Sequence, residues 1–169
     1  MVLTKQELIS SLQNEVRILL HLIGKIDKTK LDYRPTPKQR SFLDLIQYMA
    51  IMGPTMVAAI HQGIFTREAM TAIWGPAEAA AKAMNFDQAV AAIEKQSGDY
   101  ARLLGPWTDD ELRCEIDTFG SKTTRGAALV NMILTAHAAY RTQLFCYLKS
   151  IGREELNTIN LWMGTDGTM

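Results

Sequence analysis

The sequence has few cysteines, no surplus of charge and no long apolar run. Its two cysteines, Cys114 and Cys146, lie far apart and form no CxxC pair, so we expect free thiols in a reducing compartment. The 18 basic and 18 acidic residues cancel, whereas a nucleic-acid footprint needs a basic surplus. Without about eighteen consecutive apolar residues, no membrane span is expected. The first residues do not resemble a secretion signal, which predicts a cytoplasmic protein.

Regular alternation of apolar and polar residues is also scarce, which leaves few supportable strands. Apolar residues recur instead at helical spacing. The patterns predict one short helix at Thr66–Trp74, ended by Gly75-Pro76, and four long helices: Lys5–Asp27, Ser41–Gly63, Asn85–Gly105 and Thr124–Gly152. A proline inside the second long helix, Pro54, should kink or split it. Trp107–Lys122 is expected to be irregular, with one helical turn at Asp109–Leu112.

These elements predict an all-α fold. Four long amphipathic helices, with one long connection between the second and the third, favour a helix bundle with a crossover. A length of 169 residues fits a single domain over 1–169, because domains usually have about 100–200 residues. The tail 153–169 contains Leu161 and Trp162, so we expect it to dock on the bundle or on a partner chain.

The candidate chemistry is centred on histidine, which occurs only three times. No two histidines lie within four residues of each other, so the helical two-histidine metal spacing is absent. His137 interrupts the apolar stripe of the last long helix, and Tyr140 shares its face. Buried polar groups need partners, so these residues predict a polar pocket inside the bundle. Tyr48 and Asp44, on the second long helix, are candidate partners.

From Gln6 to Gly152 the chain resembles the DinB-like superfamily, also called YfiT-like. The first similar segment, Leu-Asp-Tyr-Arg-Pro-Thr-Pro at 31–37, matches the family's loop into its second helix. The segment Ser-Phe-Leu-Asp-Leu-Ile-Gln-Tyr-Met at 41–49 matches the place of the family's first metal-binding histidine. The segment His-Ala-Ala-Tyr-Arg-Thr-Gln-Leu at 137–144 matches its His-x-x-His-Arg-x-Gln-Leu signature.

The resemblance implies a four-helix bundle with up-down-down-up topology, often homodimeric. Family members commonly hold a divalent metal with three histidines at one end of the bundle, and characterised relatives include thiol transferases and isomerases. Here only His137 matches a histidine, while Tyr48 and Tyr140 occupy the other two positions. A phenol must lose a proton with a pKa of ~10 before it can bind a metal as imidazole does. The resemblance therefore implies a degenerate site, expected to lack a divalent metal.

Three functions remain open. In the first, the protein binds or transforms a small molecule, with His137 as general base and Tyr48 and Tyr140 as orienting or oxyanion-stabilising groups. The second is a non-catalytic interaction or structural protein, in which methionines of the second long helix form an adaptable contact surface, unless they are simply core. The third is a metal-dependent, thiol-transferase-like enzyme with an altered site. Two phenolates and one imidazole would suit ferric iron better than zinc.

Overall fold

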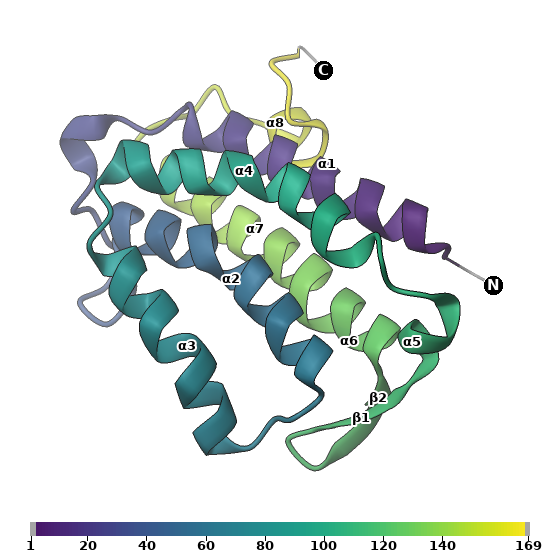
Figure 1. Cartoon of the computed structure of the whole chain (residues 1–169). Coiled ribbons are helices and arrows are strands. Elements are labelled where there is room, and N and C mark those ends of the chain that lie inside the picture. The colour runs from purple at the N-terminus through teal and green to yellow at the C-terminus, as the bar shows by residue number, and fades with distance from the viewer. Residues whose placement is uncertain (1–2, 168–169) are drawn as a thin grey trace.

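The computed structural model describes residues 3–167 of a largely helical molecule (Figure 1). Its elements, in chain order, are α1 (Lys5–Ile23), η1 (Lys28–Lys30), α2 (Phe42–Gln62), α3 (Arg67–Lys82), α4 (Phe86–Leu104), α5 (Asp109–Arg113), β1 (Glu115–Thr118), β2 (Ser121–Thr124), α6 (Arg125–Leu129), η2 (Val130–Leu134), α7 (Thr135–Ser150) and α8 (Thr158–Met163). The prediction of a mostly helical protein is confirmed. The structure also contains a small β-hairpin, β1–β2, that was not predicted.

Four long helices surround the core. Helix α1 packs against α4 and α7, and α2 packs against the same two helices. Their apolar stripes meet in the interior, where Leu12, Met49, Ile93 and Leu144 are fully buried. The chain passes from α2 to α4 through α3, which packs along α2 (Figure 1). This connection places α3 beside the face of α2 that carries Tyr48.

Local sequence sets where the long helices begin. In α1 the Thr4 side chain accepts from the Glu7 amide while the Glu7 carboxylate accepts from the Thr4 amide, which completes a capping box. Asn85 caps α4 through the same reciprocal bonds with Gln88. Such boxes satisfy amides that the first helical turn leaves without partners. The predicted start of α1 is confirmed, but α1 ends at Ile23, four residues before the predicted end.

Two prolines lie inside helices without ending them, for different reasons. Proline removes one amide from the helix and leaves the carbonyl four residues earlier without its partner. Pro76 and Ala72 are both exposed on α3, so water can hydrate the freed carbonyl. The prediction that this helix ends at Trp74 is therefore wrong, because α3 continues to Lys82. Pro54 frees the carbonyl of buried Ala50 instead, and this carbonyl finds a protein partner described below.

The region from Trp107 to Lys122 is more ordered than its composition suggested. The single helical turn is confirmed as α5. After it, β1 and β2 pair antiparallel, with Glu115 opposite Thr124 and Thr118 opposite Ser121. Phe119 at the turn has a positive φ and packs edge-on against Phe65, with ring centroids 5.5 Å apart. The hairpin was missed because its two short strands carry mostly polar residues.

Helix α2 supplies much of the core. Met49 and Met52 are fully buried and Met56 is partly buried, so the methionine stripe packs inside the bundle. By length and composition alone this helix could cross a membrane, but 61% of its most apolar window is buried inside the protein, as a core helix requires. Cys146 on α7 lies in an apolar stretch of sequence, yet its side chain is exposed.

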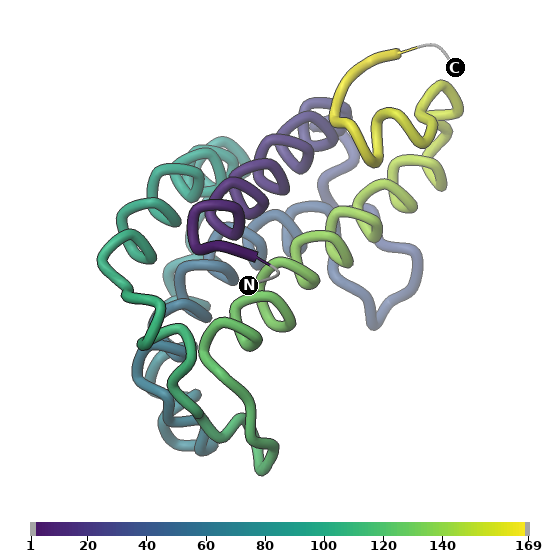
Figure 2. Tube along the Cα trace, turned by 90° about the vertical axis from the view of Figure 1, so that its right-hand side faces the viewer, coloured from purple at the N-terminus to yellow at the C-terminus, as the bar shows by residue number. Residues whose placement is uncertain are grey.

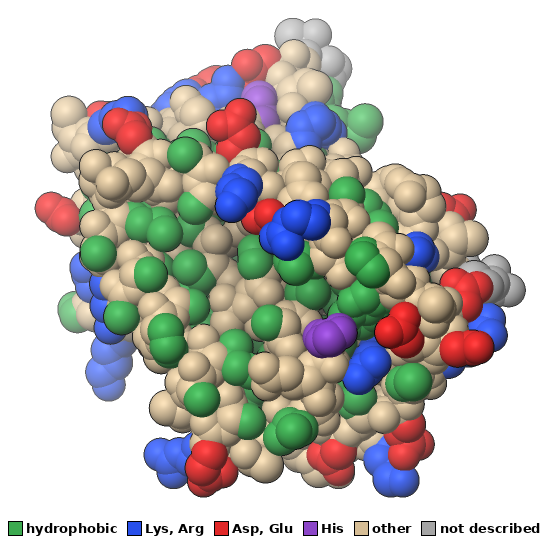
Figure 3. Space-filling view, in the orientation of Figure 1, with side chains coloured by type: hydrophobic (Ala, Val, Ile, Leu, Met, Phe, Trp, Pro, Cys, Tyr) green, Lys and Arg blue, Asp and Glu red, His purple; other side chains and the backbone are tan. Residues whose placement is uncertain are grey.

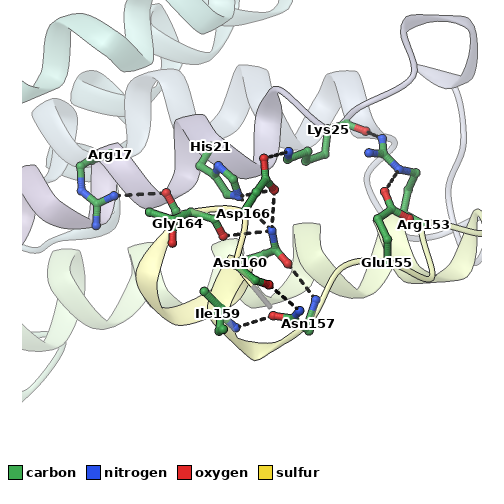
Figure 4. Close-up of polar contacts among 12 residues, drawn as sticks. Arg17, His21, Lys25, Arg153, Glu155, Asn157, Ile159, Asn160, Gly164 and Asp166 are labelled. Carbon is green, nitrogen blue, oxygen red and sulfur yellow. Dashed lines mark hydrogen bonds and ion pairs between the residues drawn. The ribbon is translucent and has the colours of Figure 1, made fainter. Parts of the chain in front are cut away.

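The tail after α7 lies along α1 (Figure 2). Buried Arg141 joins the two segments, since its Nε lies 2.8 Å from Glu15 on α1 and its guanidinium donates to the Leu161 carbonyl of α8. Farther along, the Asn160 amide donates to Asp166 and contacts Nε2 of His21 (Figure 4). Arginine can make several directed bonds from one planar group, so this buried guanidinium ties α1, α7 and α8 together.

Candidate functional site

The structure divides the predicted residues between two places. Tyr48 on α2 and Tyr140 on α7 face each other, with ring centroids 5.0 Å apart. His137, one turn earlier on α7, instead contacts Tyr100 on α4, with Nε2 2.6 Å from the phenol oxygen. Asp44 caps α2 through Ser41 and pairs with Arg34. The structure therefore presents a buried contact around His137 and a partly exposed one around Tyr48.

The buried contact extends into an interior network of Gln96, Tyr100 and His137. The Gln96 amide donates to the carbonyls of Met49 and Ala50 at 2.7 and 2.9 Å. The Ala50 carbonyl is the one that Pro54 leaves without its helical partner, so Gln96 supplies the missing donor. All three side chains of the network are buried, where an unpaired carbonyl would be costly.

Gly53 makes room for this network. A Cβ atom added there would lie 1.8 Å from the Tyr100 hydroxyl oxygen. Only glycine lets α2 and the phenol approach so closely. The Gly53-Pro54 pair therefore has two roles that fit together, since the glycine admits Tyr100 and the proline provides an acceptor for Gln96.

A wide turn leads into the histidine. Segment η2 is π-helical, and the amide of Thr135 bonds the Val130 carbonyl five residues earlier. Such turns insert one extra residue into an α-helix and are frequent at functional sites. Here η2 lies immediately before α7 and sets which face of α7 carries His137 and Tyr140.

Donor counting assigns the proton of His137. Gln96 uses both amide hydrogens on carbonyls, and its oxygen lies 3.3 Å from the Tyr100 hydroxyl, which donates to it. We therefore assign the imidazole Nε2–H as the donor to the Tyr100 oxygen, and Nδ1 is then a buried atom with no hydrogen-bond partner among residues 3–167. Burial, with help from the nearby Arg141 charge, lowers the pKa of His137 to about 4. His137 is thus a neutral structural hydrogen-bond donor at neutral pH.

Tyr48 lies beside a cleft of about 320 Å³ between α2 and α3. Its ring stacks against Trp74 of α3 at 5.8 Å and 14°, and the Arg40 guanidinium lies 4.0 Å from its ring centroid. Burial and a hydrogen bond with Tyr140 raise the pKa of Tyr48 far above its ordinary value, so the phenol stays protonated. The cleft is lined by Arg40, Asp44, Gln47, Tyr48, Ile51, Glu78, Ala81 and Lys82.

The donor set does not fit the divalent metal that the resemblance implies. Within residues 3–167, no group of three or more His, Cys, Asp or Glu side chains is placed to hold an ion. The only imidazole of the expected set is engaged with Tyr100 through Nε2. Metal binding by Tyr48 would require a phenolate, whereas its environment favours the neutral phenol.

Sequence reasoning missed Tyr100, Gln96, Arg40 and Trp74. Gln96 and Tyr100 are one turn apart on α4, in line with the buried Ile93. A polar pair inside an apolar stripe is the same signal that selected His137, and it could have found them. No comparable signal marks Arg40 or Trp74, because their placement depends on how α3 and the loop before α2 fold back on Tyr48.

The chain is similar in fold to a crystallised DinB-like protein, YjoA, from Bacillus subtilis. The two share 20% sequence identity, the match covers 89% of this chain and 95% of that chain, and the TM-score is 0.65. No protein-family model matches the sequence, and no curated protein matches it. The comparisons therefore show a DinB-like fold.

Proposed function

We propose that the protein binds a small molecule in the cleft beside Tyr48 and holds no divalent metal of the kind common among DinB-like proteins. The observation that carries this proposal is the charge lining of the cleft. Arg40, Glu78 and Lys82 line it, and none of the three forms an ion pair within the described part of the chain. Convergent polar groups beside aromatic rings are typical of ligand pockets.

Tyr48 and Tyr140 are the tyrosines that we propose to contact the ligand. Tyr48 lines the cleft directly, and Tyr140 packs on it. His137 is 1% exposed and its Nε2 is engaged with Tyr100, so a role as general base would require the bundle to open. We assign it a positioning role instead, in which the interior network fixes the distance between α4 and α7. Catalysis in the cleft would have to use other groups.

A ligand screen by nuclear magnetic resonance tests this proposal. Wild type is compared with Tyr48→Ala, which removes the ring at the cleft, and with Arg113→Ala, which alters a separate cleft near α5. We expect ligands that bind wild type and Arg113→Ala but lose binding to Tyr48→Ala. Ligands that bind all three proteins equally would place the site elsewhere and refute the proposal.

Elemental analysis of the purified protein tests the metal component. We expect less than stoichiometric zinc, nickel or iron. The alternative, ferric iron held by His137, Tyr48 and Tyr140, predicts a visible tyrosinate charge-transfer colour that disappears in Tyr48→Phe. Stoichiometric zinc that is lost in His137→Gln would favour the metal-dependent thiol-transferase alternative.

The up-down-down-up path and the homodimer remain proposals with separate support. The direction of the chain colours along α1, α2, α4 and α7 in Figure 1 supports the path. Trp162 and Met163 on α8 are 65% and 59% exposed, and an apolar pair on the surface is suited to a second copy. Light scattering on wild type and Trp162→Glu tests the dimer, which should become monomeric in the variant.

We also propose a cytoplasmic protein with no nucleic-acid or membrane partner. The charges of both signs interspersed over the face in Figure 3 support the first exclusion, because phosphate backbones are bound by basic patches. A gel-shift measurement at low salt would contradict it if nucleic acid bound with micromolar affinity.

A further inference from the structure

Three aromatic rings from three helices meet beside the cleft, and we call them the aromatic cluster: Tyr48, Trp74 and Tyr140. Trp74 stacks nearly parallel on Tyr48, and Tyr140 meets Tyr48 at 62°. Helix α3 contributes Trp74 by packing along α2. The three rings are only partly buried, and Tyr48 is the one that lines the cleft directly.

A cation already lies on this cluster. The Arg40 guanidinium carbon is 4.0 Å from the ring centroid of Tyr48 and 5.9 Å from that of Tyr140. Cations within about 6 Å of a ring centroid are attracted by the electron-rich face of the ring. Arg40 is exposed and forms no ion pair or hydrogen bond with the described residues. Besides the two rings, Arg40 interacts electrostatically with Asp44, whose pKa it helps to lower.

The charges around the cleft favour replacement of Arg40 by another cation. With Arg40 in place, the lining carries two cations, Arg40 and Lys82, and two carboxylates, Asp44 and Glu78. Withdrawal of Arg40 leaves one excess negative charge. Asp44 is already engaged by Ser41 and Arg34, so Glu78 is the carboxylate that remains available to a ligand.

We propose that the cleft binds an organic cation of the quaternary-ammonium or guanidinium type, which displaces the Arg40 side chain from the aromatic cluster. Aromatic cages recognise quaternary ammonium groups by this chemistry. Arg40 then acts as an internal competitor, which lowers the apparent affinity by the fraction of molecules in which it covers the rings. This inference rests on the proposed small-molecule site and specifies the class of its ligand.

Titration with tetramethylammonium, followed by the ring-current shift of its methyl protons, tests the proposal. Arg40→Ala should bind this cation at least about fivefold more tightly than wild type, because the internal competitor is gone. Lys38→Ala is the matched control, since Lys38 lies two residues earlier in the same exposed loop and carries the same charge. Adding Tyr140→Ala to Arg40→Ala should remove the gain, because the site that Arg40 occupies lies over Tyr48 and Tyr140.

Equal affinity of Arg40→Ala and Lys38→Ala would overturn the proposal, because it would reduce the effect to general electrostatics. Weaker binding by Arg40→Ala would also overturn it, because Arg40 would then support the site instead of competing for it. Arg40→Gln, which keeps most of the chain length without the charge, replaces Arg40→Ala if that variant fails to fold. Neutral or anionic ligands that need Tyr48 would refute this ligand class but leave the proposed site intact, whereas the absence of any ligand would refute both.

Discussion

Acid should weaken this protein through His137 before most of its carboxylates titrate. The pKa of this imidazole falls from 6.5 to about 4 on burial. As the pH drops below 6.5, His137 becomes protonated in the unfolded chain but stays neutral in the folded protein. Proton binding therefore stabilises the unfolded state relative to the folded state. Each pKa unit corresponds to about 1.36 kcal/mol. At pH 5 the loss in free energy of unfolding is therefore about 2 kcal/mol, and it approaches about 3 kcal/mol at pH 4.

Urea unfolding of wild type and His137→Gln at pH 7.5 and pH 5.0 measures this effect. The variant removes the titrating group while keeping an amide that can donate to Tyr100. It should be less stable than wild type at pH 7.5, and the gap should shrink by about 2 kcal/mol at pH 5.0. The pKa of His21 is also lowered by partial burial, but His21 is present in both proteins and its contribution cancels. A gap that stays constant between the two pH values would refute a buried, neutral His137.

Three further changes test the packing. Gly53→Ala places a Cβ atom 1.8 Å from the Tyr100 hydroxyl oxygen and should cost about 3 kcal/mol of unfolding free energy; adding Tyr100→Phe should recover part of that loss. Gln96→Leu should cost about 1–3 kcal/mol by leaving the buried Ala50 carbonyl unpaired. Adding Pro54→Ala should return some of that loss by restoring a helical amide, as a double-mutant cycle in urea would measure. Asn160→Ala should speed hydrogen exchange in residues 153–167 while α4 stays protected; unchanged exchange in the tail would contradict the contacts drawn in Figure 4.

The helices were predictable because their signals are local. Thr4 with Glu7 and Asn85 with Gln88 mark helix starts within four residues of sequence, and apolar spacing marks the buried faces. Gly75-Pro76 misled because a helix can continue past a proline where water hydrates the carbonyl that the proline frees, as it can at exposed Ala72. Whether water reaches that carbonyl depends on its exposure in the folded protein, which the position of Pro76 in the sequence does not reveal.

The site was harder to predict because its contacts are tertiary. The periodicity of α7 placed His137 and Tyr140 on one face, but a shared face did not fix which helix each residue meets. His137 reaches Tyr100 on α4, whereas Tyr140 reaches Tyr48 on α2. Trp74 joins Tyr48 only because α3 continues past its glycine and proline and folds against α2.

The wide turn η2 determines the orientation of both contacts at once. Each residue of an α-helix rotates the chain by about 100°. Deleting one residue from Val130–Leu134 would convert the π turn to an ordinary α turn and rotate all of α7 by that amount about its own axis. The contact between His137 and Tyr100 and the contact between Tyr140 and Tyr48 would then be lost together. Homologous proteins should therefore tolerate side-chain changes at exposed Asn131 far better than an insertion or deletion within η2.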